Sequence, residues 1–418
     1  MKSRKKILGG EIKQYTMVIA LVVLIIVFHI ATGGRMITSS NMQNLISGNA
    51  YVLVLAIGML MVIVIGQIDL SVGSVAGFVG MVTAISARNF ELPWWIAVLI
   101  GIAVGLIIGA WQGFWLSKFG IPGFITTLGG QMIFRGAVIW ISKSISVPAP
   151  KELKIFGAGH LPDFGREFTG MNNSTLILGL LVIGWYIFSQ LRKRAKETKL
   201  THESQPVLPL VIRIVLMSIA IGYLTHLFGT GRTGTSFPVP GLILVALVII
   251  YHIVTTRTRF GRHIYAVGGN KSAAALSGVN VQKTYFLTML NMSFLAALAG
   301  IMFIGRSTAA GPSDGTGWEL DAIAAVFIGG AAVSGGVGTV MATIVGGLVM
   351  AVLNSGLMLL GVGADRTQVI KGLVLLLAVA FDVYNKTQGK KSIVGMIQQN
   401  FNRLKKTEKS DNSKLTAR

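Results

Sequence analysis

About twelve apolar stretches, most of them near the length of a membrane span, follow one another along this chain of 418 residues. A hydrocarbon core of about 30 Å needs about 20 apolar residues for one helical crossing. The stretches do not alternate polar and apolar residues as the strands of a membrane barrel do. We therefore expect an all-α polytopic membrane protein, a bundle of about 10–12 transmembrane helices. The stretches are residues 15–32, 51–66, 70–87, 94–116, 124–141, 174–188, 207–228, 240–254, 285–304, 322–333, 339–360 and 369–383.

Two of these stretches need not cross the membrane completely. Residues 70–87 follow the preceding stretch after a few residues, and residues 322–333 are short. Irregular backbone at membrane depth is stable only where protein or a water-filled cavity satisfies its polar groups. Each of the two is therefore expected to be a full crossing, a broken helix or a re-entrant helix.

The basic residues gather at the ends of the apolar stretches, although the net charge of +22 could suggest a nucleic-acid binder. Loops rich in Lys and Arg stay on the cytoplasmic side. The rich segments are the amino tail, residues 191–206, residues 255–284 and the carboxyl tail. Both termini are therefore expected in the cytoplasm, with membrane lipid and no nucleic acid as a partner.

The same pattern predicts three regions of the chain. They are a basic cytoplasmic tail at 1–14, a transmembrane domain at 15–385 with a cytoplasmic loop at 255–284, and a basic cytoplasmic tail at 386–418. The first apolar stretch is longer than a usual signal-peptide core and is followed by a poor cleavage site. We expect it to be retained as a helix.

Several kinds of chemistry have no support in the sequence. The chain has no cysteine, its six histidines are scattered, and no Gly-x-x-x-x-Gly-Lys-Ser/Thr phosphate loop occurs. We expect no metal site, no cofactor held by this chain and no enzymatic activity of its own. A membrane-embedded enzyme lacks a visible reactive constellation. An ion-coupled carrier is disfavoured, since no mid-span acid has a basic partner, but it stays open.

Polar residues within the apolar stretches are candidates for a translocation path, because such residues are costly at membrane depth. Residues 66–73 set an amide, an acid and a hydroxyl between two apolar stretches. Asp69 is more simply explained as the cap of the following helix, and Glu319 with Asp321 as acids at a helix start. Helix-to-helix hydrogen bonding is the ordinary explanation of Asn354 and Gln368. The candidate set is Gln67, Asp69, Ser71, Phe124, Thr126, Glu319, Asp321, Asn354 and Gln368.

The basic loop at 255–284 carries more pattern than retention in the cytoplasm requires. An alanine-rich stretch between Asn270 and Gly278 predicts a short helix that could seat in a cleft of a cytoplasmic partner. The alternative is that the arginines only follow the inside bias, but this leaves Phe260 and the glycines unexplained. The candidate docking residues are Arg259, Phe260, Gly261, Arg262, Gly268, Gly269, Asn270, Ala274 and Gly278.

Taken together, these motifs resemble the ribose/xylose-type sugar permeases of ATP-binding-cassette importers, over nearly the whole chain. Gln67 stands where many members of that family have glycine. The motifs that carry the resemblance are Ala56-Ile57-Gly58-Met59, residues 66–73, Pro122-Gly123-Phe124-Ile125-Thr126-Thr127-Leu128-Gly129, residues 259–278 and Glu319-Leu320-Asp321-Ala322-Ile323-Ala324-Ala325.

The resemblance implies a homodimeric permease in the cytoplasmic membrane of a prokaryote. It implies that a separate ATPase, which uses ATP and Mg, docks on the basic loop and drives alternating access, and that an external binding protein delivers the sugar. The stretch at 207–228 resembles the xylose or multiple-sugar branch more than the ribose branch. Another monosaccharide or a nucleoside stays possible. The outer loop at 142–173 is either a docking surface or a connector.

Overall fold

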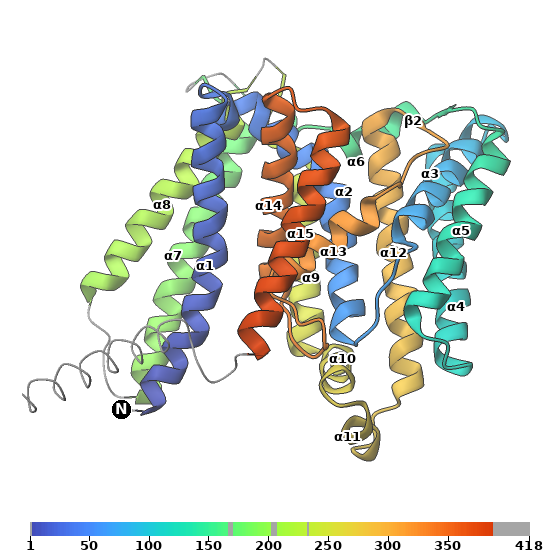
Figure 1. The fold of residues 1–418 in the computed structure, drawn as a ribbon. Coiled ribbons are helices and arrows are strands. Elements are labelled where there is room, and N and C mark those ends of the chain that lie inside the picture. The colour runs from blue at the N-terminus through green and yellow to red at the C-terminus, as the bar shows by residue number, and fades with distance from the viewer. Residues whose placement is uncertain (1, 166–169, 202–206, 232–233, 388–418) are drawn as a thin grey trace, which may run out of the picture. The chain divides into compact units, whose positions relative to one another are not determined.

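The computed structural model describes residues 2–165, 170–201, 207–231 and 234–387, and nearly all regular structure in them is helical (Figure 1). Contacts divide the chain into two units, Met1–Thr367 and Gln368–Arg418. The described part of the second unit is the greater part of α15. The described helices are α1 (Lys2–Ala31), α2 (Ser39–Val64), α3 (Val72–Arg88), α4 (Trp94–Lys118), α5 (Gly123–Ser142), α6 (Lys154–Ala158), α7 (Asn173–Thr201), α8 (Val207–Gly229), α9 (Val239–Arg257), α10 (Arg259–Gly269), α11 (Lys271–Leu276), α12 (Val281–Ser307), α13 (Trp318–Ile328), α14 (Val340–Leu359) and α15 (Ala364–Thr387).

The all-α membrane architecture predicted from the sequence is confirmed. Among the described residues, eight helices are long and apolar enough to cross a membrane: α2, α4, α5, α7, α8, α9, α12 and α14. Two further apolar helices, Met17–Ala31 within α1 and Val72–Arg88, are shorter. The strands β1 (Val147–Pro148) and β2 (Ala309–Ala310) form one small antiparallel pair.

The stretch at 322–333 is a broken helix and not a full crossing. Helix α13 has 11 residues, which is about 16 Å of helix and too short for the hydrocarbon core. It ends at Gly329 and Gly330, the second of which has a φ of 85°. The chain then runs without regular structure to Thr339, whose side chain caps α14 by accepting from Ala342 N at 3.2 Å.

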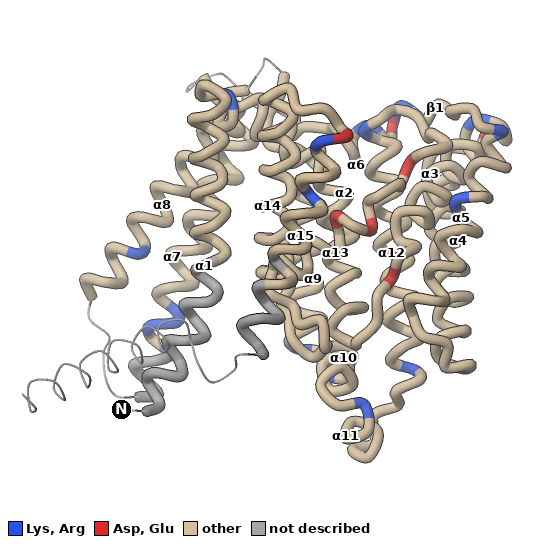
Figure 2. The backbone as a smooth tube through the Cα atoms, viewed as in Figure 1, with Lys and Arg blue, Asp and Glu red and all other residues tan. Residues whose placement is uncertain are grey.

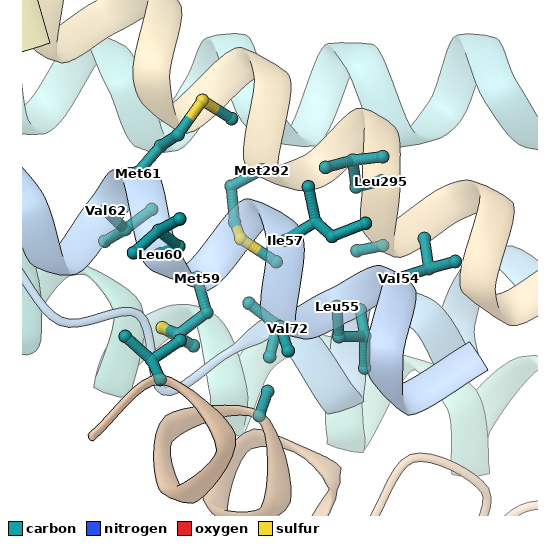
Figure 3. Close-up of a cluster of buried hydrophobic side chains, with 14 of the residues drawn as sticks. Val54, Leu55, Ile57, Met59, Leu60, Met61, Val62, Val72, Met292 and Leu295 are labelled. Carbon is teal, nitrogen blue, oxygen red and sulfur yellow. The ribbon is translucent and has the colours of Figure 1, made fainter. Parts of the chain in front are cut away.

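Helix α2 is the centre of the first unit. It packs against α9, α12, α13 and α14. Within its most apolar 18 residues, 72% are buried, whereas none of the most apolar 18 residues of α8 are buried. Figure 3 shows Ile57 of α2 in one cluster with Met292 of α12 and Val72 of α3. Since lipid gives helices no hydrophobic reason to associate, close packing of this kind holds the bundle together.

Helices α4 and α12 approach each other along three glycines spaced four residues apart: Gly105, Gly109 and Gly113. Residues at this spacing share one face of a helix. A Cβ on Gly105 would lie 2.7 Å from Ala297 Cβ, and one on Gly109 would lie 2.8 Å from Ser293 Cβ. Both partners belong to α12, so a larger residue on this face would push the two helices apart.

The alanine-rich helix predicted in the basic loop is confirmed as α11. Asn270 caps it, with its side chain accepting from Ala273 N at 2.9 Å, and Gly278 follows it with a φ of 82°. Helices α10 and α11 lie at the end of the first unit where α9 ends, as does the end of α7 (Figure 1). Lys and Arg gather at this end and at the opposite end, while acidic residues also lie between them (Figure 2).

Candidate functional site

The irregular segment at residues 65–71, between α2 and α3, is the centre of the candidate site. Gln67 N donates to Val62 O at 2.9 Å, and Gly66 takes a φ of 83°, which turns the chain out of α2. Asp69 Oδ1 then accepts from Ser71 N at 2.8 Å and from Ser71 Oγ at 2.7 Å. Asp69 is only 1% exposed. The N-cap of α3 is Ser71, which makes no side-chain cap hydrogen bond, so Asp69 does not cap α3 directly as the sequence suggested but holds the turn that leads into it.

Helices α4 and α5 hold this segment in place. Gln112 Nε2 donates to Ser71 Oγ at 2.7 Å from the second half of α4. Leu70 N donates to Thr127 Oγ1 at 3.1 Å, and Gly123 N donates to Gln67 Oε1 at 2.7 Å. Because the first amides of a helix have no partner within it, Gln67 satisfies the start of α5. This contact gives Gln67 a structural role.

Helix α13 completes the site from the other side of α3. Gln131 Nε2 of α5 donates to Glu319 Oε1 at 3.0 Å. The second oxygen, Glu319 Oε2, faces Gly73, where an added Cβ would lie 2.5 Å from it. Arg135 Nη1 donates to Asp314 O at 2.7 Å in the loop before α13. Glu319 of α13 and the irregular segment at 65–71, which we call the break before α3, therefore belong to one polar region.

Three polar atoms in this region are buried without a hydrogen-bond partner among the described residues: Ser74 Oγ, Gln112 Oε1 and Glu319 Oε2. A buried polar group left unpaired costs about 1–3 kcal/mol, so water or a ligand is expected to pair with such atoms. All three can accept a hydrogen bond. The region therefore suits a solute that donates hydroxyl hydrogens.

The remaining path candidates lie around this network or apart from it. Phe124 is exposed and Thr126 is buried in the first turn of α5, where Thr126 Oγ1 donates to Pro122 O at 3.4 Å. Asp321 is half-buried one turn into α13, and Asn354 is half-buried on α14. Gln368 is an exposed residue of the second unit. None of the hydrogen bonds that build the segment at 65–71 involves these five residues.

Sequence reasoning missed three residues that build the site: Gln112, Thr127 and Gln131. Gln112 is 0% exposed within an apolar helix of 25 residues. This position was the available signal in the sequence, since a polar side chain within a span needs a partner. Acidic residues give a stronger signal, because the free-energy cost of a charge at membrane depth is larger than that of an amide. No three His, Asp or Glu side chains come together as a metal site within the parts of the chain that are described.

The basic loop forms an exposed surface at one end of the bundle. Thr258 Oγ1 accepts from Gly261 N at 3.1 Å and caps α10, while Arg259 and Arg262 remain exposed. Gly261 lies against the end of α9, where a Cβ would meet Val254 O at 2.3 Å. Phe260 packs partly into the core. The chain itself leaves Leu276, at the end of α11, 92% exposed.

The inner side of α10 is fixed by a tyrosine. Tyr265 Oη donates to Gly338 O at 2.7 Å. Burial raises the pKa of Tyr265 above its ordinary value, so its hydroxyl keeps its proton and remains a donor over the physiological pH range. Helix α10 therefore has one face toward the interior of the first unit and one toward solvent.

Eight helices among the described residues are long and apolar enough to cross a membrane, and an irregular segment that holds polar side chains lies between α2 and α3, which indicates a multi-pass membrane protein. A protein family described as the permease component of a branched-chain amino acid transport system matches residues 41–379. The chain belongs to this family, and it is a permease subunit of the cytoplasmic membrane.

The curated relatives are sugar permeases. The xylose transport system permease protein XylH of Haemophilus influenzae is 36% identical over 91% of this chain and 99% of its own length. The XylH protein of Escherichia coli K12 is 35% identical over 90% of this chain and 93% of its own. The ribose import permease protein RbsC of Escherichia coli K12 is 32% identical over 88% of this chain and 93% of its own length. These relatives confirm the predicted resemblance to ribose/xylose-type permeases. No solved structure matches the chain.

Proposed function

We propose that this chain is the membrane-spanning subunit of an ATP-binding-cassette importer and that it carries a monosaccharide, a xylose-like pentose or several sugars, into the cell by alternating access. The likeness over the full length of XylH supports this most strongly. In this proposal the chain is not an enzyme, and ATP and Mg are used by a separate ATPase.

The polar region supports a sugar more than a branched-chain amino acid, although the family description names the latter. An amino acid at neutral pH carries a cation and an anion, and its branched side chain needs an apolar pocket. The unpaired atoms here are Ser74 Oγ, Gln112 Oε1 and Glu319 Oε2. Hydroxyl groups of an uncharged sugar can donate to all of them.

The exposed surface of α10 and α11 is the proposed docking site of the ATPase. Arg259 and Arg262 supply positive charge, and Leu276 supplies an apolar side chain that the described residues leave exposed. A short rigid helix seated in a cleft can pass on the motion of a partner. The basic charge of the amino and carboxyl tails favours the cytoplasm for both termini. In this proposal two copies of the permease pair with two ATPase subunits.

The opposite end of the bundle is the proposed side of the sugar-binding protein. There the loop at 142–173 carries β1, the 3-10 helix η2 (Lys151–Leu153) and α6. His160 Nδ1 lies 2.9 Å from Ser236 O, which ties this loop to the segment before α9. A cavity of about 660 Å³ lies between the loop and the residues Gly229, Gly231, Gly234 and Thr235. Short helical and strand elements beside a recess support docking more than a plain connector would.

The experiment that tests the proposal is uptake by the complete complex in vesicles. Permease, ATPase and binding protein are reconstituted, and labelled xylose, ribose, a hexose, a nucleoside and leucine are offered with and without ATP. We expect accumulation of a pentose that needs ATP, the ATPase and the binding protein. Accumulation of leucine or of the nucleoside instead would overturn the choice of substrate. Accumulation driven by an ion gradient without the ATPase would favour a secondary carrier.

A further inference from the structure

The inner side of α10 meets two other parts of the chain at a close junction, which we call the glycine joint. Its residues are Tyr265 and Gly268 of α10, Val64 of α2, and Gly336 and Gly338 of the segment before α14. Gly336 N donates to Val64 O at 2.7 Å, and Tyr265 Oη donates to Gly338 O at 2.7 Å. A Cβ on Gly268 would lie 1.7 Å from Val64 O. Three separate parts of the chain therefore meet here with no side chain between their backbones.

The joint leaves α10 little freedom to move by itself. Gly336 has a φ of 73°, and a Cβ on it would lie 2.9 Å from Gly269 Cα. Packed interfaces of this kind do not deform gradually but move as units. A displacement of α10 therefore carries with it the end of α2 and the segment before α14.

The elements on either side of the joint lead to the polar region. Val64 is the last residue of α2 and directly precedes the segment at 65–71, which holds Asp69 and Ser71. Gly336 and Gly338 belong to the segment that follows α13, the helix of Glu319. The first route is short, whereas the second runs back through the irregular segment after α13 and along that helix to Glu319 in its first turn. Both start at the face of α10 opposite the exposed arginines.

We propose that Tyr265 and Gly268 are positioning residues for coupling: through the glycine joint, α10 moves the break before α3 and the end of α13 together. This inference rests on the proposed function, because it needs an ATPase that acts on α10. The family resemblance assigns a coupling role to the exposed loop, whereas the joint names the internal contacts that would receive the movement.

Three variants test the joint, and two of them form a matched pair. Gly268→Ala sets a methyl group against Val64 O, whereas Gly184→Ala, at an exposed position of α7, meets no atom within 4 Å. Tyr265→Phe removes only the hydroxyl that donates to Gly338 O. Each variant is reconstituted with the ATPase and the binding protein, and ATP hydrolysis and sugar uptake are measured in the same vesicles.

We expect Gly268→Ala and Tyr265→Phe to lower the number of sugars moved per ATP by about threefold to tenfold, which is within the range for contacts along a coupling route. Gly184→Ala should keep the ratio of the unaltered complex. If Gly268→Ala fails to assemble, the milder Tyr265→Phe decides the question. Wild-type ratios in the variants that assemble would overturn the inference. So would a proportional loss of hydrolysis and uptake, which indicates a purely structural role.

The unaltered complex separates this inference from the proposed function. If it moves no sugar with ATP, the proposed function fails and the inference fails with it. If it moves sugar and the variants keep its ratio, only the role of the joint is refuted.

Discussion

Gln112 on α4 donates its Nε2 hydrogen to Ser71 Oγ at 2.7 Å, and this bond links the second half of a spanning helix to the residue that directly precedes α3. Ser71 Oγ in turn donates to Asp69 Oδ1 at 2.7 Å. The other end of the amide, Gln112 Oε1, is buried without a partner among the described residues. One side chain thus both holds the break in position and offers an acceptor at it.

Replacing Gln112 with Leu should therefore slow transport. The change removes the bond to Ser71 and the free acceptor while keeping most of the volume. Loss of one or two hydrogen bonds to the moving sugar should lower the maximal uptake rate by about threefold to tenfold. The measurement is the initial rate of uptake at saturating binding protein, scaled to the permease in the membrane.

Gln43→Leu is the matched control for this change. Gln43 is also buried on a spanning helix and donates to Phe228 O at 2.9 Å, away from the segment at 65–71. The Gln43→Leu variant should be less stable, but its sugar uptake rate per folded permease should not change. Equal rates for both variants would argue against a role of Gln112 in transport.

Asp69 should act mainly by holding the turn before α3. Asp69→Ala removes the acceptor of Ser71 N and Ser71 Oγ, and it should lower the free energy of unfolding by about 1–3 kcal/mol, because buried donors lose their partner. Asp69→Asn keeps a side-chain oxygen and should recover most of that loss. Thermal unfolding of the purified permease in detergent measures both. An Asn variant that is stable but transports no sugar would show that the carboxylate itself serves transport.

The apolar stretches predicted the helices well, but they placed some ends wrongly. The stretch at 51–66 covers only the C-terminal half of α2, which begins at Ser39. The missed residues include Gln43, whose amide is paired with a carbonyl of α8 and is buried despite its polarity. Hydropathy reports the preference of a residue for lipid and not the presence of a polar partner.

The candidate site was predicted in part. Residues 66–73 were recognisable because acid, amide and hydroxyl stand together between apolar stretches. The partners of these residues were not, because Gln112 lies 41 residues from Ser71 and a single sequence gives the type of a residue but not its neighbour. The glycine joint was hidden for the same reason: Gly268 and Gly336 are readable as glycines, but the approach of Val64 O is a property of the packed bundle.

The glycines of α4 should tolerate no large side chain. Gly109→Leu forces α4 away from Ser293 of α12 and should lower the free energy of unfolding by about 3 kcal/mol, the upper part of the range for overpacking. Ala103→Leu makes a similar change on an exposed position of the same helix and should be nearly neutral. Folded yield and the unfolding midpoint in detergent test this. Similar midpoints for the two variants would contradict close packing of α4 on α12.

The charge of the α10 surface should decide how well the ATPase binds. Arg259→Glu combined with Arg262→Glu reverses two exposed charges that the core does not need, so the permease should fold normally. Reversing charges at the edge of an interface mainly slows association, and we expect the affinity for the ATPase to fall by about tenfold, less at high salt. Binding of the purified ATPase to permease in nanodiscs measures this. As a control, Arg192→Glu reverses one exposed charge on α7, away from the α10 surface, and it should have little effect on the affinity. Unchanged affinity and unchanged ATP hydrolysis in the double variant would move the docking site away from α10.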